Sequence, residues 1–337
     1  MNDARPLSTS AQWNKVLKPY AMPSTSRSLA QLALTTSLFG AFMSGACAMG
    51  LLHPLLAIPM ALTAGLLLVR LFIIQHDCGH RSYFRSKAAC DIVGRLLGVL
   101  TFVPYGYWRR DHDKHHATSG NLDHRGHGDI DTMTVAEFLA AGPRQRMLYR
   151  LYRSPVVLLA VAPAWQFILR YRLPIKLGPR GRIKTILGVL GHDVALAAVL
   201  GSAVFLLGWK ITLTVWLTAV LTGGTAGLWL FYVQHCFPDA YWERNERWSI
   251  VDSSLKGCSY YRLPPFLHWL TGNIGYHHVH HLSARIPNYN LPSAHQEIAS
   301  RCTVPSLGIK ESLGTIRLAL WCERKERMVS FKEAVCS

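Results

Sequence analysis

Residues 54–80 read PLLAIPMALTAGLLLVRLFIIQHDCGH, an apolar run that ends in two histidines four residues apart. A membrane-spanning helix needs about 20 mostly apolar residues, so 54–74 is long enough to cross a bilayer. On a helix, residues i and i+4 project from one face about 5–6 Å apart. The stretch therefore predicts a membrane span whose end presents His76 and His80 to a single metal ion.

Further apolar stretches extend this interpretation to the whole chain. Residues 28–49, 185–209 and 211–233 also have the length and composition of spans. Two shorter stretches, 92–108 and 155–169, are interrupted by charged residues, glycine or proline and are expected to lie at the membrane interface. The sequence predicts an all-α integral membrane protein with four transmembrane helices and two interfacial helices.

The distribution of charge predicts the orientation in the membrane. The chain has 36 Lys and Arg against 19 Asp and Glu, a formal charge of +17. Four basic residues precede the first span, 18 lie in 75–184 and 12 follow Val233, whereas the two turns hold Lys210 alone. The positive-inside rule then places these three segments, and both termini, in the cytoplasm. The excess charge reflects topology and some attraction to anionic lipid, so it gives no reason to expect a nucleic-acid partner.

Three segments follow from this topology. They are a cytoplasmic N-terminal segment 1–27, a membrane domain 28–300 and a cytoplasmic C-terminal tail 301–337. About the last 30 residues are rich in charge and are expected to form a solvated helix.

Nine of the 16 histidines fall in three clusters on the predicted cytoplasmic side. The clusters are HDCGH at 76–80, HDKHH at 112–116 and HHVHH at 277–281. Positions i, i+3 and i+4 share a helix face. The predicted ligands are therefore His76, His80, His112, His115, His116, His277, His280 and His281. His235 ends the fourth span at the same level and is a ninth candidate, whereas His278 falls on the flank of its helix.

The number and kind of ligands indicate the metal. Imidazole binds zinc, copper, nickel and iron, but eight clustered histidines are too many for one ion and suit two. Carboxylate-bridged iron pairs need Glu-x-x-His motifs, and the chain has none. A nearly all-nitrogen pair of irons is the prediction, with Asp77, Asp111 and Asp113 as carboxylates that hold the ring N–H groups.

Other functions compete with this one. A membrane metal transporter or sensor would place its ligands near the bilayer midplane, whereas nearly all histidines here lie outside the predicted spans. A surface patch that scavenges nickel or zinc would explain one cluster but not three on one membrane face. The remaining histidines are expected to have ordinary polar or solvated roles; they are His53, His124, His127, His192, His268 and His295.

At its histidine clusters the chain resembles the membrane fatty acid desaturase superfamily, whose motifs run HxxxH, HxxHH, HxxHH. The resemblance covers roughly residues 30–300 and is greatest to the acyl-lipid omega-6 (delta-12) branch. It rests on the strings WRRDH at 108–112, HATSGNLD at 116–123, GDI at 128–130, FYVQH at 231–235, GYH at 275–277 and HLSARIPNYNL at 281–291.

The resemblance implies four spans under a helical cytoplasmic cap that holds two irons. Family members use O2 and two electrons to leave a cis double bond in an acyl chain. The eight clustered ligands carry over residue by residue, with His235 as the additional family histidine. The family's water-mediated asparagine has no match, because Phe231 stands at that position.

The resemblance leaves the substrate and the electron donor open. Fatty acyl hydroxylases and carotenoid ketolases or hydroxylases share the iron motifs, and a shared fold does not decide between these reactions. A fused cytochrome b5 module is not expected, because His53-Pro54 is followed by leucines and not by glycines, so ferredoxin or free cytochrome b5 is the implied donor. An acyl substrate needs an apolar tunnel, whose candidate lining is Trp108, Trp229, Phe231, Tyr232 and Trp269.

Overall fold

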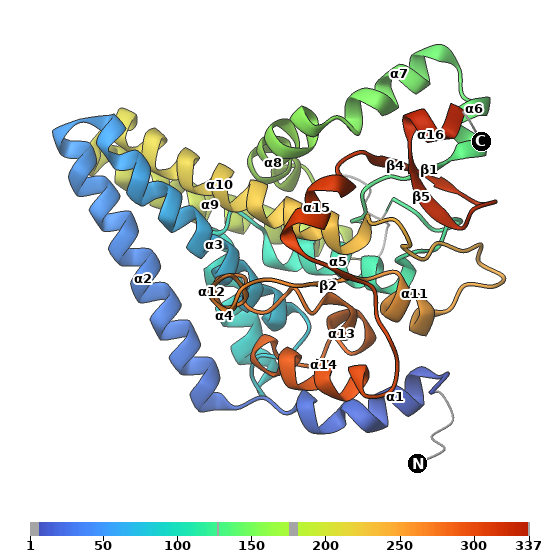
Figure 1. Cartoon of the computed structure of the whole chain (residues 1–337). Helices are drawn as coiled ribbons and strands as arrows, with labels where there is room; N and C mark the ends of the chain where they lie inside the picture. The colour runs from blue at the N-terminus through green and yellow to red at the C-terminus, as the bar shows by residue number, and fades with distance from the viewer. Residues whose placement is uncertain (1–6, 127, 175–180, 336–337) are drawn as a thin grey trace.

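Four long apolar helices lie together on one side of the computed structural model, which describes residues 7–126, 128–174 and 181–335 (Figure 1). They are α2 (Thr25–Leu52), α3 (Ile58–Gly79), α9 (Arg182–Leu207) and α10 (Trp209–His235). All four, with α3 extended back to Pro54, are long and apolar enough to cross a membrane. The four predicted spans are therefore confirmed as helices, and the chain has the character of a multi-pass membrane protein.

The helices are paired by two short turns. His53 takes an extended backbone between α2 and α3, and its ring Nδ1 accepts from the Leu55 amide at 3.3 Å. Gly208 joins α9 to α10 at φ +80°, a conformation that favours glycine. Both turns lie at one end of the bundle, and the first and last helices, α1 (Ser10–Leu17) and α16 (Phe331–Val335), lie far from it (Figure 1).

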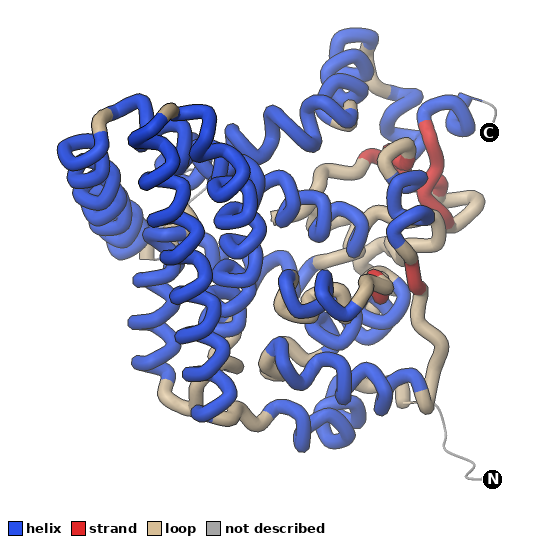
Figure 2. The backbone as a smooth tube through the Cα atoms, turned by 60° about the vertical axis from the view of Figure 1, so that its left-hand side comes forward, coloured by secondary structure: helices blue, strands red, loops and turns tan. Residues whose placement is uncertain are grey.

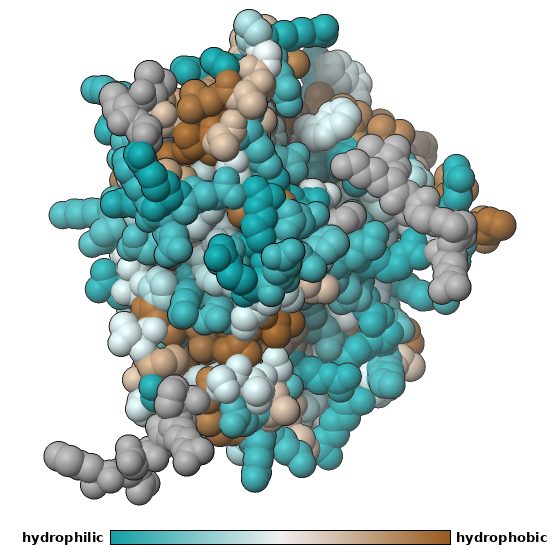
Figure 3. Space-filling view, turned by 90° about the vertical axis from the view of Figure 1, so that its right-hand side faces the viewer, coloured by the Kyte–Doolittle hydropathy of each residue, from teal (hydrophilic) through white to brown (hydrophobic). Residues whose placement is uncertain are grey.

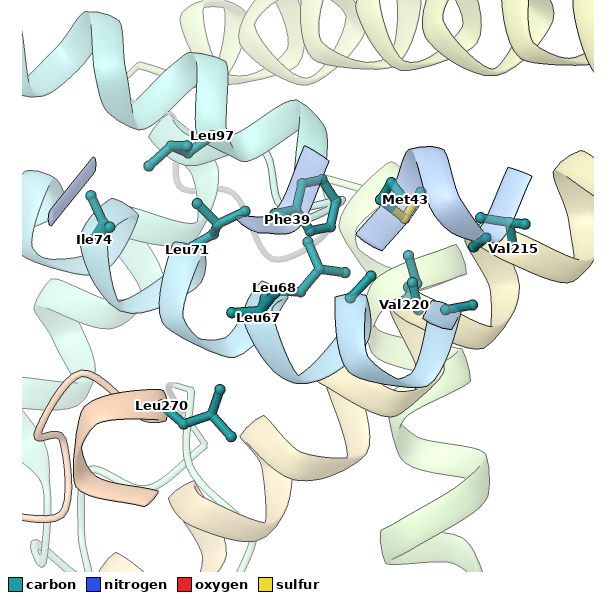
Figure 4. Close-up of a cluster of buried hydrophobic side chains, with 14 of the residues drawn as sticks. Phe39, Met43, Leu67, Leu68, Leu71, Ile74, Leu97, Val215, Val220 and Leu270 are labelled. Carbon is teal, nitrogen blue, oxygen red and sulfur yellow. The ribbon is translucent and has the colours of Figure 1, made fainter. Parts of the chain in front are cut away.

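α3 is the central helix of the bundle. Of the most apolar 18-residue stretch of this span, 61% is buried inside the protein, whereas the corresponding share of α9 is 17%. The outward-facing leucines and valines of α9 are suited to contact with lipid. Figure 4 shows the core around it, in which Leu67 and Leu71 of α3 meet Phe39 and Met43 of α2 and Val220 of α10.

α3 and α10 approach each other closely through glycine. A Cβ on Gly65 would lie 2.6 Å from the Ala219 carbonyl oxygen, and one on Gly223 would lie 2.8 Å from the Gly65 carbonyl oxygen. Small residues let the backbones of membrane helices come this near. The contact sets the distance between the two helices that carry His76 and His235.

One charge lies inside the bundle, which the sequence interpretation had overlooked. Arg70 of α3 is buried, donates to the Trp269 carbonyl and to the Thr35 hydroxyl, and stacks 4.4 Å from the Trp269 ring. Trp269 belongs to α12 (Pro265–Leu270), so the arginine ties this short helix to the spans.

The remaining helices are shorter, and most of them gather at the end of the bundle opposite the turns (Figure 2), whereas α8 packs alongside α10 (Figure 1). They are α4 (Lys87–Leu100), α5 (Tyr105–Thr118), α6 (Val135–Ala140), α7 (Pro143–Tyr152), α8 (Ala162–Ala164), α11 (Ile250–Lys256), α13 (His277–Leu282), α14 (Leu291–Ala299) and α15 (Ile309–Thr315). The face shown in Figure 3 is mostly hydrophilic, in contrast to the apolar bundle.

The two predicted interfacial segments have broken helical structure. Residues 92–108 cover parts of α4 and α5, which bend by 104° at a break before Pro104. Residues 155–169 include the π-helical turns Val157–Val161 and Trp165–Leu169, and this helix meets α7 at 57°. If each bent pair were one broken span, the chain would have up to six spans.

The prediction of a helical C-terminal tail was wrong. Residues 318–322 and 327–330 form the antiparallel strands β4 (Leu318–Cys322) and β5 (Arg327–Ser330), and β1 (Met133–Thr134) pairs parallel with β4. A second small sheet pairs β2 (Tyr260–Tyr261) with β3 (Ser306–Leu307), so the fold is mostly but not wholly helical. The charged run that suggested a helix is the turn between β4 and β5, and the apolar residues beside it are buried.

We expect Gly65→Ala to lower the apparent melting temperature of the purified protein. The added methyl meets a backbone oxygen that cannot move without shifting α10, and overpacking costs about 1–3 kcal/mol. Gly188→Ala on α9 is the matched control, because its Cβ would meet nothing within 4 Å. Equal melting temperatures for both variants would show that the α3–α10 contact can accommodate a methyl group without loss of stability.

Candidate metal centre

All nine predicted ligands meet at the end of the bundle that carries the short helices. His76 and His80 come from α3 and its C-terminal cap, and His235 is the last residue of α10. The others belong to α5 and α13. Their ring nitrogens form two groups, each with its ligand atoms within 4.8 Å of one another. The first group is His76, His80, His112, His116 and His280, and the second is His115, His235, His277 and His281.

Helix geometry explains how the clusters divide. The i, i+4 pairs stay together, since His112 and His116 share the first group and His277 and His281 share the second. The histidine at i+3 turns to the other group in both helices, which separates His115 from its neighbours on α5. Each HxxHH motif therefore serves both groups, whereas the sequence interpretation had placed its three rings on one face.

Ring nitrogens face one another at short range within each group. The His116 Nε2 atom lies 3.1 Å from His112 Nε2 and 2.9 Å from His280 Nε2. In the second group, His235 Nε2 lies 2.8 Å from His277 Nε2 and 3.2 Å from His115 Nε2. A pair of ring nitrogens at this range can share a proton, but each ring has only one N–H group, so the convergence of four or five rings suits a cation that all of them bind.

Two further nitrogens point to the same conclusion. His80 Nε2 and His281 Nε2 are buried and have no hydrogen-bond partner. Buried polar atoms are almost always satisfied, so each such atom needs an explanation. Coordination of a metal ion by both atoms would supply it, and the donor set therefore fits a pair of ions.

The three rings of α13 favour the neutral form. Burial, and then the neighbouring imidazoles, holds the pKa values of His277, His280 and His281 well below the ordinary value of 6.5. Neutral imidazole, with a free lone pair, is the metal-binding form. These three rings are therefore suited to bind metal near pH 7.

Two carboxylates orient rings by contact with Nδ1. Asp77 lies 3.3 Å from His76 Nδ1, as the sequence predicted, and also accepts from the backbone amide of Asn288 at 2.7 Å. Asp129 makes a short hydrogen bond to His115 Nδ1, which leaves Nε2 for the metal. The predicted partners Asp111 and Asp113 instead pair with arginines, at 3.7 Å and 3.8 Å respectively.

Sequence reasoning missed Asp129 because no helical spacing links it to His115. The loop after α5 turns back, and Gly128 at φ +71° lies against the His115 side chain, where a Cβ would be 3.4 Å away. The GDI string at 128–130 was the available signal.

The second group has one histidine fewer, and aromatic and thiol groups lie beside it. The Phe231 ring lies 5.2 Å from that of His115 and 4.9 Å from that of His235. The buried Cys258 Sγ lies 3.8 Å from His235 Nδ1. An apolar ring thus covers the side of this group where the resemblance implied a polar residue.

The other described histidines lie outside both groups. His278 Nε2 lies 3.0 Å from His295 Nδ1, which agrees with its placement on the flank of its helix. His192 Nε2 donates to the Gly98 carbonyl at 3.0 Å, as expected of a satisfied polar role. His127 lies outside the described residues.

A cavity of about 460 Å³ leads from the first and second groups into the bundle. His76, His112 and His277 line one part of it, and apolar residues of α3, α10 and the π-helical segment line the rest. Polar residues also line it, among them Asp111, Asp131, Tyr152 and Arg170. The cavity therefore offers both polar and apolar side chains, and its lining is largely apolar.

Only two of the five aromatic residues predicted to line a tunnel do so. Trp108 and Phe231 line the cavity. Trp229 faces a separate groove, and the Tyr232 hydroxyl donates to the Thr315 carbonyl at 2.8 Å. Trp269 covers Arg70, so the last three have packing roles.

Comparison with known proteins gives the family that this chain matches. The family model described as fatty acid desaturase matches residues 32–309. A fatty acid desaturase of Bacillus subtilis (strain 168) is 41% identical over 323 residues, which cover 95% of this chain and 90% of that protein.

Two cyanobacterial proteins are more distant. An sn-1 oleoyl-lipid 12-desaturase of Synechocystis sp. is 28% identical over 68% of this chain and 65% of that protein. An sn-1 acyl-lipid omega-3 desaturase (ferredoxin) of Nostoc sp. is 29% identical over 70% of this chain and 66% of that protein.

Ligand substitutions test the two groups separately. We expect His116→Ala to weaken metal binding at the first group and His281→Ala to weaken it at the second. Each loss of affinity should exceed the ~10–100-fold typical of residues that only hydrogen-bond to a ligand. Elemental analysis of the purified protein measures the metal content. His278→Ala on the same helix as His281 is the control and should keep its metal. Full metal content in either ligand variant contradicts the assignment.

The contact between Asp129 and His115 predicts a smaller effect. Asp129→Asn removes the negative charge that orients the ring, so metal affinity should fall by about 10–100-fold without loss of the fold. Competition with a chelator of known affinity measures the change, and Asp239→Asn at an exposed position is the control. Equal affinity in the two variants would exclude an orienting role.

Proposed function

The chain belongs to the fatty acid desaturase family of oxidoreductases, and we propose that it introduces a cis double bond into a lipid-linked acyl chain. In this proposal it uses two histidine-bound iron ions, O2 and two electrons. The observation that carries the proposal is the pair of histidine groups at the end of a largely apolar cavity.

The reaction needs an oxidising cofactor. Two hydrogens leave neighbouring methylene carbons, a carbon–carbon double bond forms, and O2 takes up these hydrogens, two electrons and two protons to give two waters. Side-chain acids and bases cannot break an unactivated C–H bond, so bound iron would supply the oxidising power.

The chain's own residues then have three tasks. The nine histidines hold the ions, with five nitrogens in one group and four in the other. Asp77 and Asp129 orient rings through Nδ1. Phe231 and Trp108 line the cavity beside the histidines and exclude water from it.

The cavity supports an acyl substrate. Its interior between α3 and α10 is apolar, which suits methylene groups, and its polar residues suit the ester or head group of a lipid. The names of the Synechocystis and Nostoc relatives refer to acyl groups on lipids, and the first refers to position 12 of an oleoyl chain. We therefore propose a lipid-linked substrate and delta-12 (omega-6) selectivity.

The proposed orientation places both termini and the histidine groups in the cytoplasm. It is supported by the basic segments and by the location of the short helices at the end opposite the turns (Figure 1). In this arrangement the short helices form a cytoplasmic cap, and the two bent segments lie at the interface.

The electron donor would be a separate acidic protein. A basic cytoplasmic face attracts such a partner electrostatically. The name of the Nostoc relative mentions ferredoxin, which makes ferredoxin or cytochrome b5 the proposed donor.

Lipid analysis in a host without desaturases of its own tests the function. Cells that express the chain and are fed stearate or oleate should accumulate a new alkene, and mass spectrometry of the product gives its position. A diene from oleate, with the new bond at carbon 12, supports delta-12 selectivity. The variant His116→Ala is the matched control and should give no product.

Other products would decide against the proposal. A hydroxy acid in place of the alkene would show a hydroxylase, and a new alkene at another carbon would remove the delta-12 assignment alone. Product formation by His116→Ala equal to that of the unaltered chain would falsify the role of the histidine groups.

A further inference from the structure

Glycines form an unusual part of the cavity wall on α10. Gly223, Gly224 and Gly227 all line the cavity and lie within two turns of one helix. A glycine inside a helix costs about 1 kcal/mol relative to alanine, so each position needs a reason.

Packing accounts for two of the three. A Cβ on Gly223 would meet the Gly65 carbonyl oxygen at 2.8 Å, in the close contact with α3. A Cβ on Gly224 would lie 2.8 Å from the ring of Phe167. Both positions exclude a side chain because protein atoms already occupy the space.

Gly227 has no such neighbour. A Cβ at this position would meet nothing within 4 Å, although the residue is only partly exposed. Every other described glycine with this open space is fully exposed on the surface; these are Gly40, Gly106, Gly142, Gly188, Gly191, Gly201, Gly208 and Gly314. The space next to Gly227 therefore belongs to the cavity.

The position of Gly227 relates this space to the metal centre. It precedes His235 by eight residues, which is about 12 Å along a helix at 1.5 Å per residue. Val220 also lines the cavity, and by the same rise it lies about 10 Å farther from the histidines along α10. Gly227 thus stands between the histidines and the apolar part of the cavity.

We propose that Gly227 is a chain-length determinant, because the missing side chain leaves room for the methyl-terminal part of the acyl chain. This inference rests on the proposed function. The polar residues of the cavity receive the head of the lipid, and the apolar tail passes the histidines and then Gly227. A side chain at this position would fill the space that the last methylenes of a long chain need.

A size series at Gly227 tests the proposal. Gly227→Ala, Gly227→Val and Gly227→Leu are expressed in the host without desaturases, which is fed saturated and monounsaturated chains of increasing length. For Gly227→Leu, conversion of stearate and oleate should fall by about tenfold or more, the order expected when a packed site must take up extra methylenes. Conversion of palmitate and palmitoleate should fall much less, and Gly227→Ala should be intermediate.

Two controls separate cavity filling from general damage. Gly201→Leu adds the same side chain at an exposed position of α9 with open space around it, and it should keep the length profile of the unaltered chain. Metal content reports whether Gly227→Leu retains an intact centre. The melting temperature of each purified variant with added palmitoyl or stearoyl lipid gives a second readout of binding, independent of turnover.

The outcomes distinguish the two proposals. If the unaltered chain gives no alkene from any substrate, the proposed function fails. If it is active and Gly227→Leu retains metal with an unchanged ratio of long-chain to short-chain product, the length determinant is wrong. An equal loss for all chain lengths also overturns it, because blocked access or misfolding would then explain the effect.

Discussion

The convergence of nine imidazole rings on two small volumes is the constraint on which the rest of this structure depends. Within each group the ligand nitrogens lie within 4.8 Å of one another; five of the nine histidines are buried and the other four are half-buried. A cation that they share would stabilise so many ring nitrogens facing one point. The four helices that carry these rings must therefore end at, or pass by, one place. Their positions relative to one another must also be fixed.

Close packing in the helix bundle fixes these relative positions. The glycines at 65 and 223 bring α3 and α10 into backbone contact, so that the ends bearing His76 and His235 stay near each other. The carboxylates of Asp77 and Asp129 then set individual rings. The same contact between α3 and α10 shapes the cavity, because the faces of these two helices form part of its wall.

The cavity links the histidine groups to the apolar helix bundle. It begins among histidines and continues between spans, which is the direction from which an acyl chain would come. A site that must exclude water and admit a long apolar chain needs close packing beside the histidines and open space farther from them. Phe231 lines the cavity with its ring against those of His115 and His235, and Gly227 leaves open space farther along the same helix.

The sequence by itself determined the four spans, the nine histidines and the family, because apolar length and i, i+4 spacing are local properties. It also predicted that His278 would lie apart, since helix periodicity places it on the flank. Only the tertiary structure decided how the rings divide into five and four, because that depends on how α5 and α13 face each other. Asp129, the strands in the tail and the open space at Gly227 were likewise beyond the sequence, since each arises from contacts between distant segments.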